Sequence, residues 1–313
     1  MLVRMKQIRK KSDKHKNIFY WTILAFPVLQ FVVFYIGVNF KSFALAFQEF
    51  DLQGGGFVFV GFEEFWKNFI AVFQEFTKTD YLVKAFNNSI IAYLFSLLVG
   101  LTLSLLFSYY LYKKYAMSSF FKVILFLPFI ISSITLVIIY KYFVESAIPE
   151  FVLKLTGTEI EGLLSNLNTE FITILFFTIW TGFGVQTLIY SSAMSSISNE
   201  IVDAAKIDGV TPLKEFLLID IPMIAPTIAV FVVSSTATIF VNQINLYSFY
   251  GPYASNFDIW TIGYYMYRGI SAAETTLADY PYYAAFGLVM TMITIPITMI
   301  VRGLMKKADP NEG

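Results

Sequence analysis

Six long apolar segments, separated by shorter polar stretches, dominate the hydrophobic pattern of this 313-residue chain. A helix needs about 20 apolar residues to cross the hydrocarbon core of a bilayer, because each residue advances it by about 1.5 Å. The segments of this length are Phe19–Phe40, Asn88–Tyr112, Val123–Phe143, Phe171–Ala193, Met223–Tyr247 and Tyr282–Leu304. The pattern predicts an all-α integral membrane protein with six transmembrane helices.

Composition supports this class. The chain is 57% hydrophobic and 14% charged, whereas soluble domains carry roughly 25% charged residues. A net charge of zero gives nucleic-acid binding no electrostatic support. The absence of cysteine excludes disulfides, thiolate metal sites and cysteine nucleophiles. The single histidine, His15, lies in a basic tail, where a solvated residue is expected rather than a metal ligand.

Lysine and arginine predict the orientation of the spans. They gather in both terminal tails, in the connection between spans two and three, and in the loop between spans four and five. These residues are Arg4, Lys6, Arg9, Lys10, Lys11, Lys14, Lys16, Lys113, Lys114, Lys122, Lys206, Lys214, Arg302, Lys306 and Lys307. All of them fall on one side if the N-terminus is cytoplasmic, and the loop between spans three and four, on the other side, is acidic. We therefore expect a multi-pass protein of the plasma (inner) membrane with both termini cytoplasmic.

The predicted organisation is a basic cytoplasmic tail at residues 1–18, a six-span domain at 19–304 and a second tail at 305–313. The first apolar run is longer than the roughly 7–15 residues of a signal peptide, so an uncleaved first span is expected. In the outer loop, residues 41–87, three consecutive glycines predict a flexible turn, since no Lys-Ser or Lys-Thr follows them. The stretch Phe57–Ile70 predicts a short amphipathic or interfacial helix.

The most specific motif lies in the loop at residues 194–222, between spans four and five. It reads Asp203-Ala204-Ala205-Lys206-Ile207-Asp208-Gly209 and, after nine further residues, Ile219-Asp220-Ile221-Pro222. Ser198 is placed to cap a first short helix, and Gly209 to end it in a left-handed conformation. Thr211 and Pro212 predict the start of a second helix that runs to about Ile219, with Pro222 marking the turn into span five.

This loop resembles the cytoplasmic loop of permease subunits in binding-protein-dependent ABC importers. That family carries Glu-Ala-Ala, a glycine four positions after the second alanine, and Ile-x-Leu-Pro nine residues later; Asp203 stands for the glutamate and Ile221 for the leucine. The resemblance implies the type I ABC importer permease fold, with a cytoplasmic coupling helix that docks on the ATPase. The implied coupling residues are Asp203, Ala204, Ala205, Asp208, Gly209, Ile219 and Pro222. From the residues alone, a solvated loop with two capped helices stays open.

Uncharged polar groups remain inside spans that carry essentially no charge, which disfavours ion-coupled transport and a charged substrate held by this subunit alone. They are Trp180, Thr181 and Gln186 in span four, and Ser235, Thr238, Asn242 and Asn245 in span five. On a helix the last four share a face, since they recur at steps of three and four residues. Aromatic faces beside amides suit a sugar. Helix packing is the alternative, at even weight for Ser234, Ser235 and Gly182.

The chain from span one onward also resembles carbohydrate-type permeases, through Trp180-x-Gly182-x-Gly184 and through Phe240 to Gly251-Pro252. Ser235 and Asn242 align with polar sugar-contacting positions of the maltodextrin relative, whereas Thr238 and Ile239 depart from its residues. The resemblance implies a transmembrane subunit that forms a pathway with a second homologous permease. That pathway would serve ATP-driven uptake of a sugar or oligosaccharide delivered by an extracytoplasmic binding protein.

The chain has no Gly-x-x-x-x-Gly-Lys-Ser/Thr motif, so ATP and Mg are expected on two separate ATPase subunits and no cofactor on this chain. Two alternatives stay open. One is an importer of another solute, such as glycerol phosphate or a polyamine. The other is a membrane enzyme or a membrane anchor of another complex. An enzyme needs convergent acid, base or metal groups, and the spans supply no catalytic or metal-ligating set.

Overall fold

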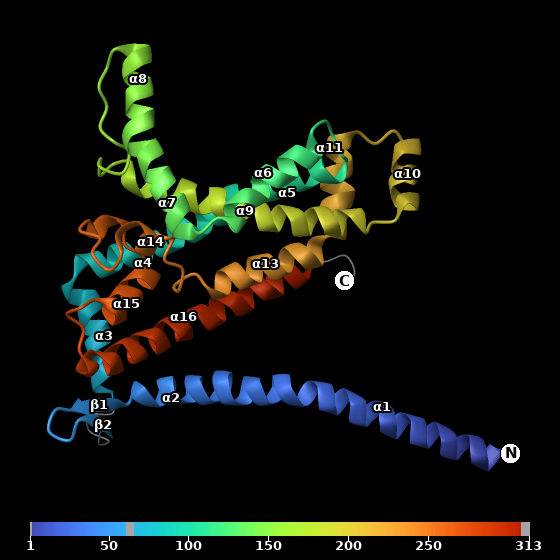
Figure 1. Cartoon of the computed structure of the whole chain (residues 1–313), viewed down its shortest axis with the longest axis horizontal. Coiled ribbons are helices and arrows are strands. Elements are labelled where there is room, and N and C mark those ends of the chain that lie inside the picture. Colours follow the sequence, from blue (N-terminus) through green and yellow to red (C-terminus); the bar gives the residue numbers. More distant parts are fainter. Residues whose placement is uncertain (1, 61–65, 308–313) are drawn as a thin grey trace. The chain divides into compact units, whose positions relative to one another are not determined.

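The computed structural model describes residues 2–60 and 66–307 (Figure 1). Residues 308–313 of the predicted C-terminal tail lie outside this part, as do the side chains of residues 2–15, His15 included. The chain divides into two compact units. The first comprises residues 1–72 and 276–288, and the second comprises residues 73–275 and 289–313.

Four helices among the described residues are long and apolar enough to cross a membrane, by length and composition. They are Lys16–Leu45, Asp80–Tyr112, Glu170–Ser195 and Leu277–Lys307. Each encloses one predicted span, so spans one, two, four and six are confirmed. Two bent helix pairs raise the number to six if each pair counts as one span. The expectation of a mainly helical membrane protein is therefore confirmed, although spans three and five are not single helices.

The first unit begins with one continuous helix made of α1 (Leu2–Gln30), the π-helical η1 (Phe31–Gly37) and α2 (Val38–Leu45). A two-stranded antiparallel hairpin follows, in which β1 (Gln48–Asp51) pairs with β2 (Gly56–Phe59). Gly54 and Gly55 lie in its turn, as predicted, whereas Gly56 begins β2.

The side-chain amide of Asn68 ties this hairpin to α3 (Lys67–Lys78), donating to the carbonyls of Ala46 and Gln48 at 2.9 and 3.1 Å. The helix predicted over Phe57–Ile70 is therefore wrong at its start. Residues 57–59 belong to β2 because their aromatic and β-branched side chains favour an extended pair; residues 61–65 lie outside the described part.

In the second unit, α4 (Asp80–Phe95), η2 (Ser96–Gly100) and α5 (Leu101–Tyr112) form one long helix, and α5 packs along α9 (Glu170–Ser195). Small side chains make this approach close. The hydroxyl of Ser108, itself fully buried, donates to the carbonyl of Thr187 at 2.9 Å. Such small-residue contacts are typical of helices packed inside a membrane.

The third predicted span, Val123–Phe143, is broken. It comprises the end of α6 (Ser118–Ile130) and the start of a second helical stretch, Ser133–Thr156, bent by 107° from α6. That stretch contains α7 (Ser133–Tyr142), η3 (Phe143–Ala147) and α8 (Ile148–Thr156). The bend falls at Ile131 and Ser132, whose ψ angles are 142° and 133°, three residues beyond Pro128. Pro128 has no N–H to donate, and Ser132 in an extended conformation starts the next helix.

The fifth predicted span, Met223–Tyr247, is also not one helix. The helix α13 (Ala225–Ala237) ends early, and residues 238–245 form turns before α14 (Leu246–Tyr250). Polar side chains compete with the helical backbone here: Asn242 Oδ1 accepts from the N–H of Ile244 at 2.8 Å. Ile244 and Asn245 take positive φ angles of 46° and 62°. The predicted shared helical face of Ser235, Thr238, Asn242 and Asn245 is therefore wrong.

The rest of the second unit packs near α4. The 3₁₀ turn η5 (Phe257–Ile259) and the helix α15 (Ile262–Ser271) contact α4. The side-chain amide of Asn88, in α4, donates to the carbonyls of Asp258 and Trp260 at 2.7 and 2.9 Å. The last helix, α16 (Tyr280–Lys307), follows the 3₁₀ turn η6 (Leu277–Asp279) and crosses from the first unit into the second.

Gly184 lies where α9 meets α6, and a Cβ atom there would overlap the carbonyl of Leu125. We expect Gly184→Ala to lower the stability of the purified protein by about 1–3 kcal/mol, the usual cost of overpacking. Gly182→Ala is the matched control, because nothing lies within 4 Å of its added carbon and alanine favours a helix by about 1 kcal/mol over glycine. The measurement is thermal unfolding in detergent; equal unfolding temperatures for the two variants would contradict the close contact.

Candidate coupling segment and solute pathway

The motif predicted at residues 194–222, here called the coupling segment, contains a short exposed helix, α10 (Asn199–Ile207). Ser198 caps it: its hydroxyl accepts from the N–H of Glu200 at 3.2 Å. Gly209 ends it with a φ angle of +71°, as predicted, and the next N–H, of Val210, returns to the carbonyl of Ala205 at 3.0 Å. Both ends of α10 are therefore closed by their own residues.

One face of α10 is buried and the other is open to solvent. Val202 and Ala205 are buried, with 5% and 7% exposed. The predicted coupling residues Asp203, Ala204, Asp208 and Gly209 are exposed, and so is Ile207, at 87%. An ion pair of 2.9 Å joins Asp203 to Lys206 one turn on, and the hydrogen bond that this carboxylate accepts from the ammonium raises the pKa of the lysine. Ala205 differs from the others because its side chain faces the protein.

The return from α10 is a continuous helical rod. It comprises α11 (Pro212–Glu215), the π-helical η4 (Phe216–Asp220) and α12 (Ile221–Met223). The expected end near Ile219 and turn at Pro222 are therefore wrong, and the turn falls at Ile224. The π-helical turn explains the difference, because the N–H of Ile221 reaches back to the carbonyl of Phe216 and the missing N–H of Pro222 leaves the rod unbroken. Ile219 and Pro222 are partly buried on this rod.

A largely buried ion pair attaches this rod to the end of α5. The ammonium of Lys113 bonds the carboxylate of Glu215, with 18% and 9% of the two side chains exposed. The same ammonium lies 4.5 Å from the ring centre of Tyr112. Nearby, the hydroxyl of Tyr109 donates to the carbonyl of Pro212 at 3.1 Å. Sequence reasoning missed this pair, because lysine after a span was interpreted only as an orientation signal.

Asp220 is the second acidic residue of the rod. It is fully buried, and neither of its carboxylate oxygens has a hydrogen-bond partner among the described residues. Lys113 interacts with it electrostatically, so a single ammonium faces the carboxylates of both Glu215 and Asp220. Burying a carboxylate without a hydrogen bond is costly, and Lys113 offsets this cost only in part.

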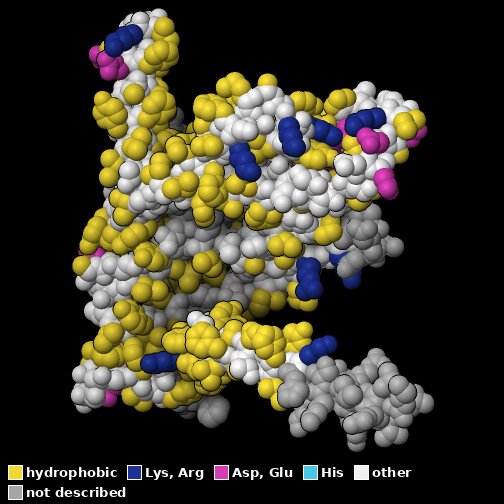
Figure 2. All heavy atoms as spheres, turned by 45° about the vertical axis from the view of Figure 1, so that its right-hand side comes forward, with side chains coloured by type: hydrophobic (Ala, Val, Ile, Leu, Met, Phe, Trp, Pro, Cys, Tyr) yellow, Lys and Arg dark blue, Asp and Glu magenta, His cyan; other side chains and the backbone are white. Residues whose placement is uncertain are grey.

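An apolar cluster holds the coupling segment against the spans. It joins α9, α10, the rod and α13 through Tyr190, Met194, Ile197, Val202, Phe216, Ile224, Ile228 and Val232. In Figure 2, acidic and basic side chains are seen together over α10 and α11, whereas hydrophobic side chains cover much of the remaining visible surface. The coupling segment is thus an exposed, charged element on a buried apolar base.

The three predicted solute residues of α9 do not share one site, because each contacts a different part of the protein. The indole of Trp180 stacks on the ring of Tyr140, with centres 6.2 Å apart, and contacts the apolar cluster around Phe177 and Phe249. The hydroxyl of Thr181 donates to the carbonyl of Phe177. Gln186 lies further along, where its amide oxygen accepts from Ser104 of α5 at 3.3 Å.

The residues predicted on span five are likewise dispersed. Ser235 donates to the carbonyl of Val232, and Thr238 to those of Ser234 and Ser235. Thr238 and Asn242 are exposed in the turns after α13. Asn245 reaches α9, donating to the hydroxyl of Thr178 at 3.3 Å. The structure therefore brings Asn245 to Thr178, which is two residues and about 200° around α9 from Trp180, while Ser235 and Gln186 lie elsewhere.

Two charged residues near this region were not predicted. Lys141 lies inside predicted span three, so the statement that the spans carry essentially no charge is wrong there; its ammonium donates to the carbonyl of Phe249 and lies 5.0 Å from the ring centre of Tyr250. Glu170, 5% exposed, accepts from Tyr250 at 2.8 Å and Asn256 at 2.6 Å. The signal for Lys141 was in the sequence: it falls two residues inside the end of an apolar run.

Comparison with known proteins places the chain in a family. Residues 92–311 match the family described as "Binding-protein-dependent transport system inner membrane component". The match covers more than half of the chain and includes the coupling segment. The chain therefore belongs to this family and is a multi-pass membrane protein of a transport system.

Its relatives include two permease proteins. The arabinooligosaccharides transport system permease protein AraP of Bacillus subtilis is 24% identical over 166 residues, 50% of this chain and 48% of AraP. The probable starch degradation products transport system permease protein AmyD of Thermoanaerobacterium thermosulfurigenes is 28% identical over 150 residues, 47% of this chain and 49% of AmyD. The chain thus spans about half the length of the curated relatives it matches.

A solved structure shares the fold. It is a chain of a bacterial ABC transporter involved in the import of the acidic polysaccharide alginate, with a TM-score of 0.71. The likeness covers 96% of this chain and 99% of that chain at 20% identity. The type I importer permease fold predicted from the sequence is therefore confirmed.

We expect Lys113→Met to destabilise the protein by about 3–5 kcal/mol, because it leaves the buried carboxylates of Glu215 and Asp220 without their cation. The double variant Lys113→Met, Glu215→Leu should lose less, since one of the two carboxylates is removed. Lys114→Met is the control, a neighbouring exposed lysine. Thermal unfolding of the purified variants checks this. A double variant as unstable as the single, or a control that loses as much, would contradict the role of the ion pair.

Proposed function

We propose that this chain is the transmembrane subunit of an ABC importer. It forms, with a second homologous permease, the pathway for ATP-driven uptake of a sugar or oligosaccharide delivered by an extracytoplasmic binding protein. Two ATPase subunits would bind ATP and Mg, and this chain would hold no cofactor and catalyse no reaction itself. The observation that carries the proposal is the exposed, capped α10 on a buried base, in a chain of this transport family.

The exposed face of α10 suits docking on a separate ATPase. Asp203, Ala204 and Asp208 present charge and small side chains to solvent, while Val202 anchors the opposite face. Small side chains allow a partner surface to approach closely. The same end of the second unit, where α10 lies, carries lysines 113, 114, 206 and 214. The orientation that we propose therefore puts α10 and both termini in the cytoplasm.

The backbone of residues 238–245 supports a solute pathway in the second unit. Inside a bilayer, irregular backbone is tolerated only where it is buried in protein or lines a water-filled cavity. The span formed by α13 breaks at this stretch, and Thr238 and Asn242 on it are exposed. The exposure of these two residues therefore favours a wet cavity, and broken helices are typical of solute sites in transporters.

The nearby side chains favour a carbohydrate. Trp180 offers an aromatic face on one side of α9, and Asn245 offers an amide beside Thr178 on the other side. Aromatic rings cover the C–H surface of a sugar while amides bond its hydroxyls. The permease relatives named for arabinooligosaccharides and starch degradation products support the same class of solute.

Lys141 favours a second candidate, an anionic solute such as glycerol phosphate. Its ammonium is partly buried near Tyr250 and keeps donors beyond the one given to Phe249. A polyamine is disfavoured, because a cationic solute would meet this charge.

Uptake by the reconstituted transporter tests the proposal. The tagged chain is purified from native membranes, and we expect a second six-span permease and an ATPase to co-purify. In proteoliposomes containing these subunits and the binding protein, ATP should drive uptake of neutral oligosaccharides in preference to glycerol phosphate or a polyamine. Trp180→Ala should reduce this uptake about tenfold, the upper range for one aromatic contact.

Ile189→Ala is the control for Trp180→Ala. Ile189 lies nine residues further along α9, about half a turn around the helix, and is 40% exposed. Uptake of glycerol phosphate alone would favour the second candidate. A chain that purifies without any ATPase would contradict the importer proposal.

Gly209 offers a test of coupling that leaves the solute pathway intact. An L-residue in its left-handed conformation costs about 1–2 kcal/mol, and nothing lies within 4 Å of an added Cβ, so the effect comes from the backbone alone. We expect uptake per ATP hydrolysed to be reduced least in Gly209→Asn, more in Gly209→Ala and most in Gly209→Val. Asparagine loses least because it tolerates this conformation best. Gly303→Ala, also without neighbours within 4 Å, is the control. Unchanged uptake in Gly209→Val, with normal assembly, would contradict the coupling role.

A further inference from the structure

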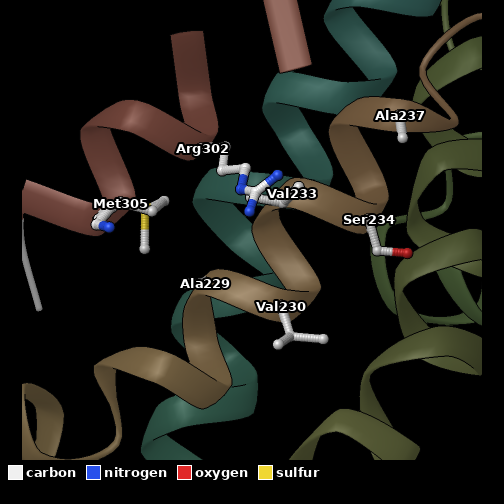
Figure 3. Close-up of a pocket in the computed structure, with 8 residues that line it drawn as sticks. Ala229, Val230, Val233, Ser234, Ala237, Arg302 and Met305 are labelled. Atoms are coloured by element: carbon white, nitrogen blue, oxygen red, sulfur yellow. The ribbon is translucent and has the colours of Figure 1, made fainter. Parts of the chain in front are cut away.

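A groove of about 470 Å³ runs between α13 and the C-terminal end of α16 (Figure 3). On one side it is lined by small apolar residues of α13, among them Ala229, Val233 and Ala237. On the other side α16 contributes Met305 and two cations, Arg302 and Lys306. All of these residues belong to the second unit.

The charge in the groove has one sign. Arg302 and Lys306 are four residues apart and so share a face of α16, and none of the described residues that line the groove is acidic. In Figure 3 the guanidinium of Arg302 extends over α13 beside Val233. The groove thus has an apolar floor with a cationic end, which complements a molecule that has an apolar body and an anionic head.

The groove lies away from the solute residue of the same helix. Ser235 follows Val233 by two residues, which is about 200° around a helix. The groove therefore opens on the side of α13 opposite to Ser235. If the pathway proposed above includes Ser235, the groove faces another environment, and for a membrane helix that environment is lipid or a neighbouring subunit.

We propose that this groove binds an anionic phospholipid, with the head group held by Arg302 and Lys306 and an acyl chain lying along α13. The inference rests on the orientation given under Proposed function, in which the end of α16 reaches the cytoplasmic membrane surface. Anionic lipids of that leaflet attract basic residues, by about fivefold in affinity for each lysine or arginine near the surface. A guanidinium also binds a phosphate group through two parallel hydrogen bonds, which makes Arg302 the principal contact.

The test uses the protein purified with the subunits that accompany it, stripped of native lipid and titrated with phosphatidylglycerol or phosphatidylcholine. Retained lipid is counted by native mass spectrometry. We expect tighter retention of phosphatidylglycerol. Arg302→Gln and Lys306→Gln should each weaken it about fivefold, and together about 30-fold. Lys307→Gln is the matched control, an adjacent exposed cation that does not line the groove.

Two further arms identify the source of the anion. Ala237→Phe fills the apolar floor and keeps both cations, so it should weaken retention of the lipid, whereas excess inorganic phosphate should not displace it. Equal retention of the two lipids by the unaltered protein would overturn the proposal, as would an equal loss in Lys307→Gln.

The remaining arm asks whether another subunit occupies the groove. Because the chain has no cysteine, Ser234→Cys places a single thiol in its lining. Efficient cross-linking of this thiol to a co-purifying protein in native membranes would assign the groove to a subunit interface and overturn the lipid proposal. Uptake is measured on the same preparations, so a failure of lipid binding is distinguished from a failure of the transport function.

Discussion

The need to satisfy every backbone N–H and C=O inside a bilayer governs this structure. Lipid offers these groups no partner, so a spanning segment must be helical wherever it meets hydrocarbon. Four long helices meet this condition directly. The two breaks, at residues 131–132 and 238–245, are then informative because their backbone must find protein or water. In the second break, Asn242 and Thr261 supply part of the answer: the side chain of the first and the hydroxyl of the second bond backbone groups.

The coupling segment keeps most of its charged side chains on its exposed side. Its exposed side carries the acidic and basic residues, and its base is apolar except for Lys113, Glu215 and Asp220. One ammonium facing two carboxylates leaves a net negative charge in a largely buried place. Well-packed apolar residues of similar volume often stabilise a protein as well as a buried ion pair does, so this trio is not explained by stability alone. The position of the trio links the end of α5 to the rod that returns from α10.

Much of this fold follows from the sequence, because span length, cap residues and turn glycines act locally. The helices around Phe19–Phe40 and Phe171–Ala193, the cap at Ser198 and the left-handed Gly209 are all predictable in this way. The breaks are not, because apolar composition alone does not distinguish one helix from two. In span five, the side chain of Asn242 bonds the N–H of Ile244, and the chain turns where periodicity indicates a continuing helix.

Lys113 and Glu215 are 102 residues apart in the sequence, and no local pattern predicts a contact over such a separation. The solute residues predicted from the sequence are likewise dispersed by tertiary contacts that no local pattern reports, such as the hydrogen bond between Gln186 and Ser104.

The rod from Pro212 to Met223 has a mechanical consequence. Twelve helical residues make a lever about 18 Å long, clamped near one end by Lys113 and jointed at the other by the 69° bend at Ile224. A load applied to α10 is carried along this lever to the joint, where α13 begins. If α10 docks on an ATPase as proposed, any displacement of α10 reaches α13 through this one rod, which would pivot about the contact between Lys113 and Glu215.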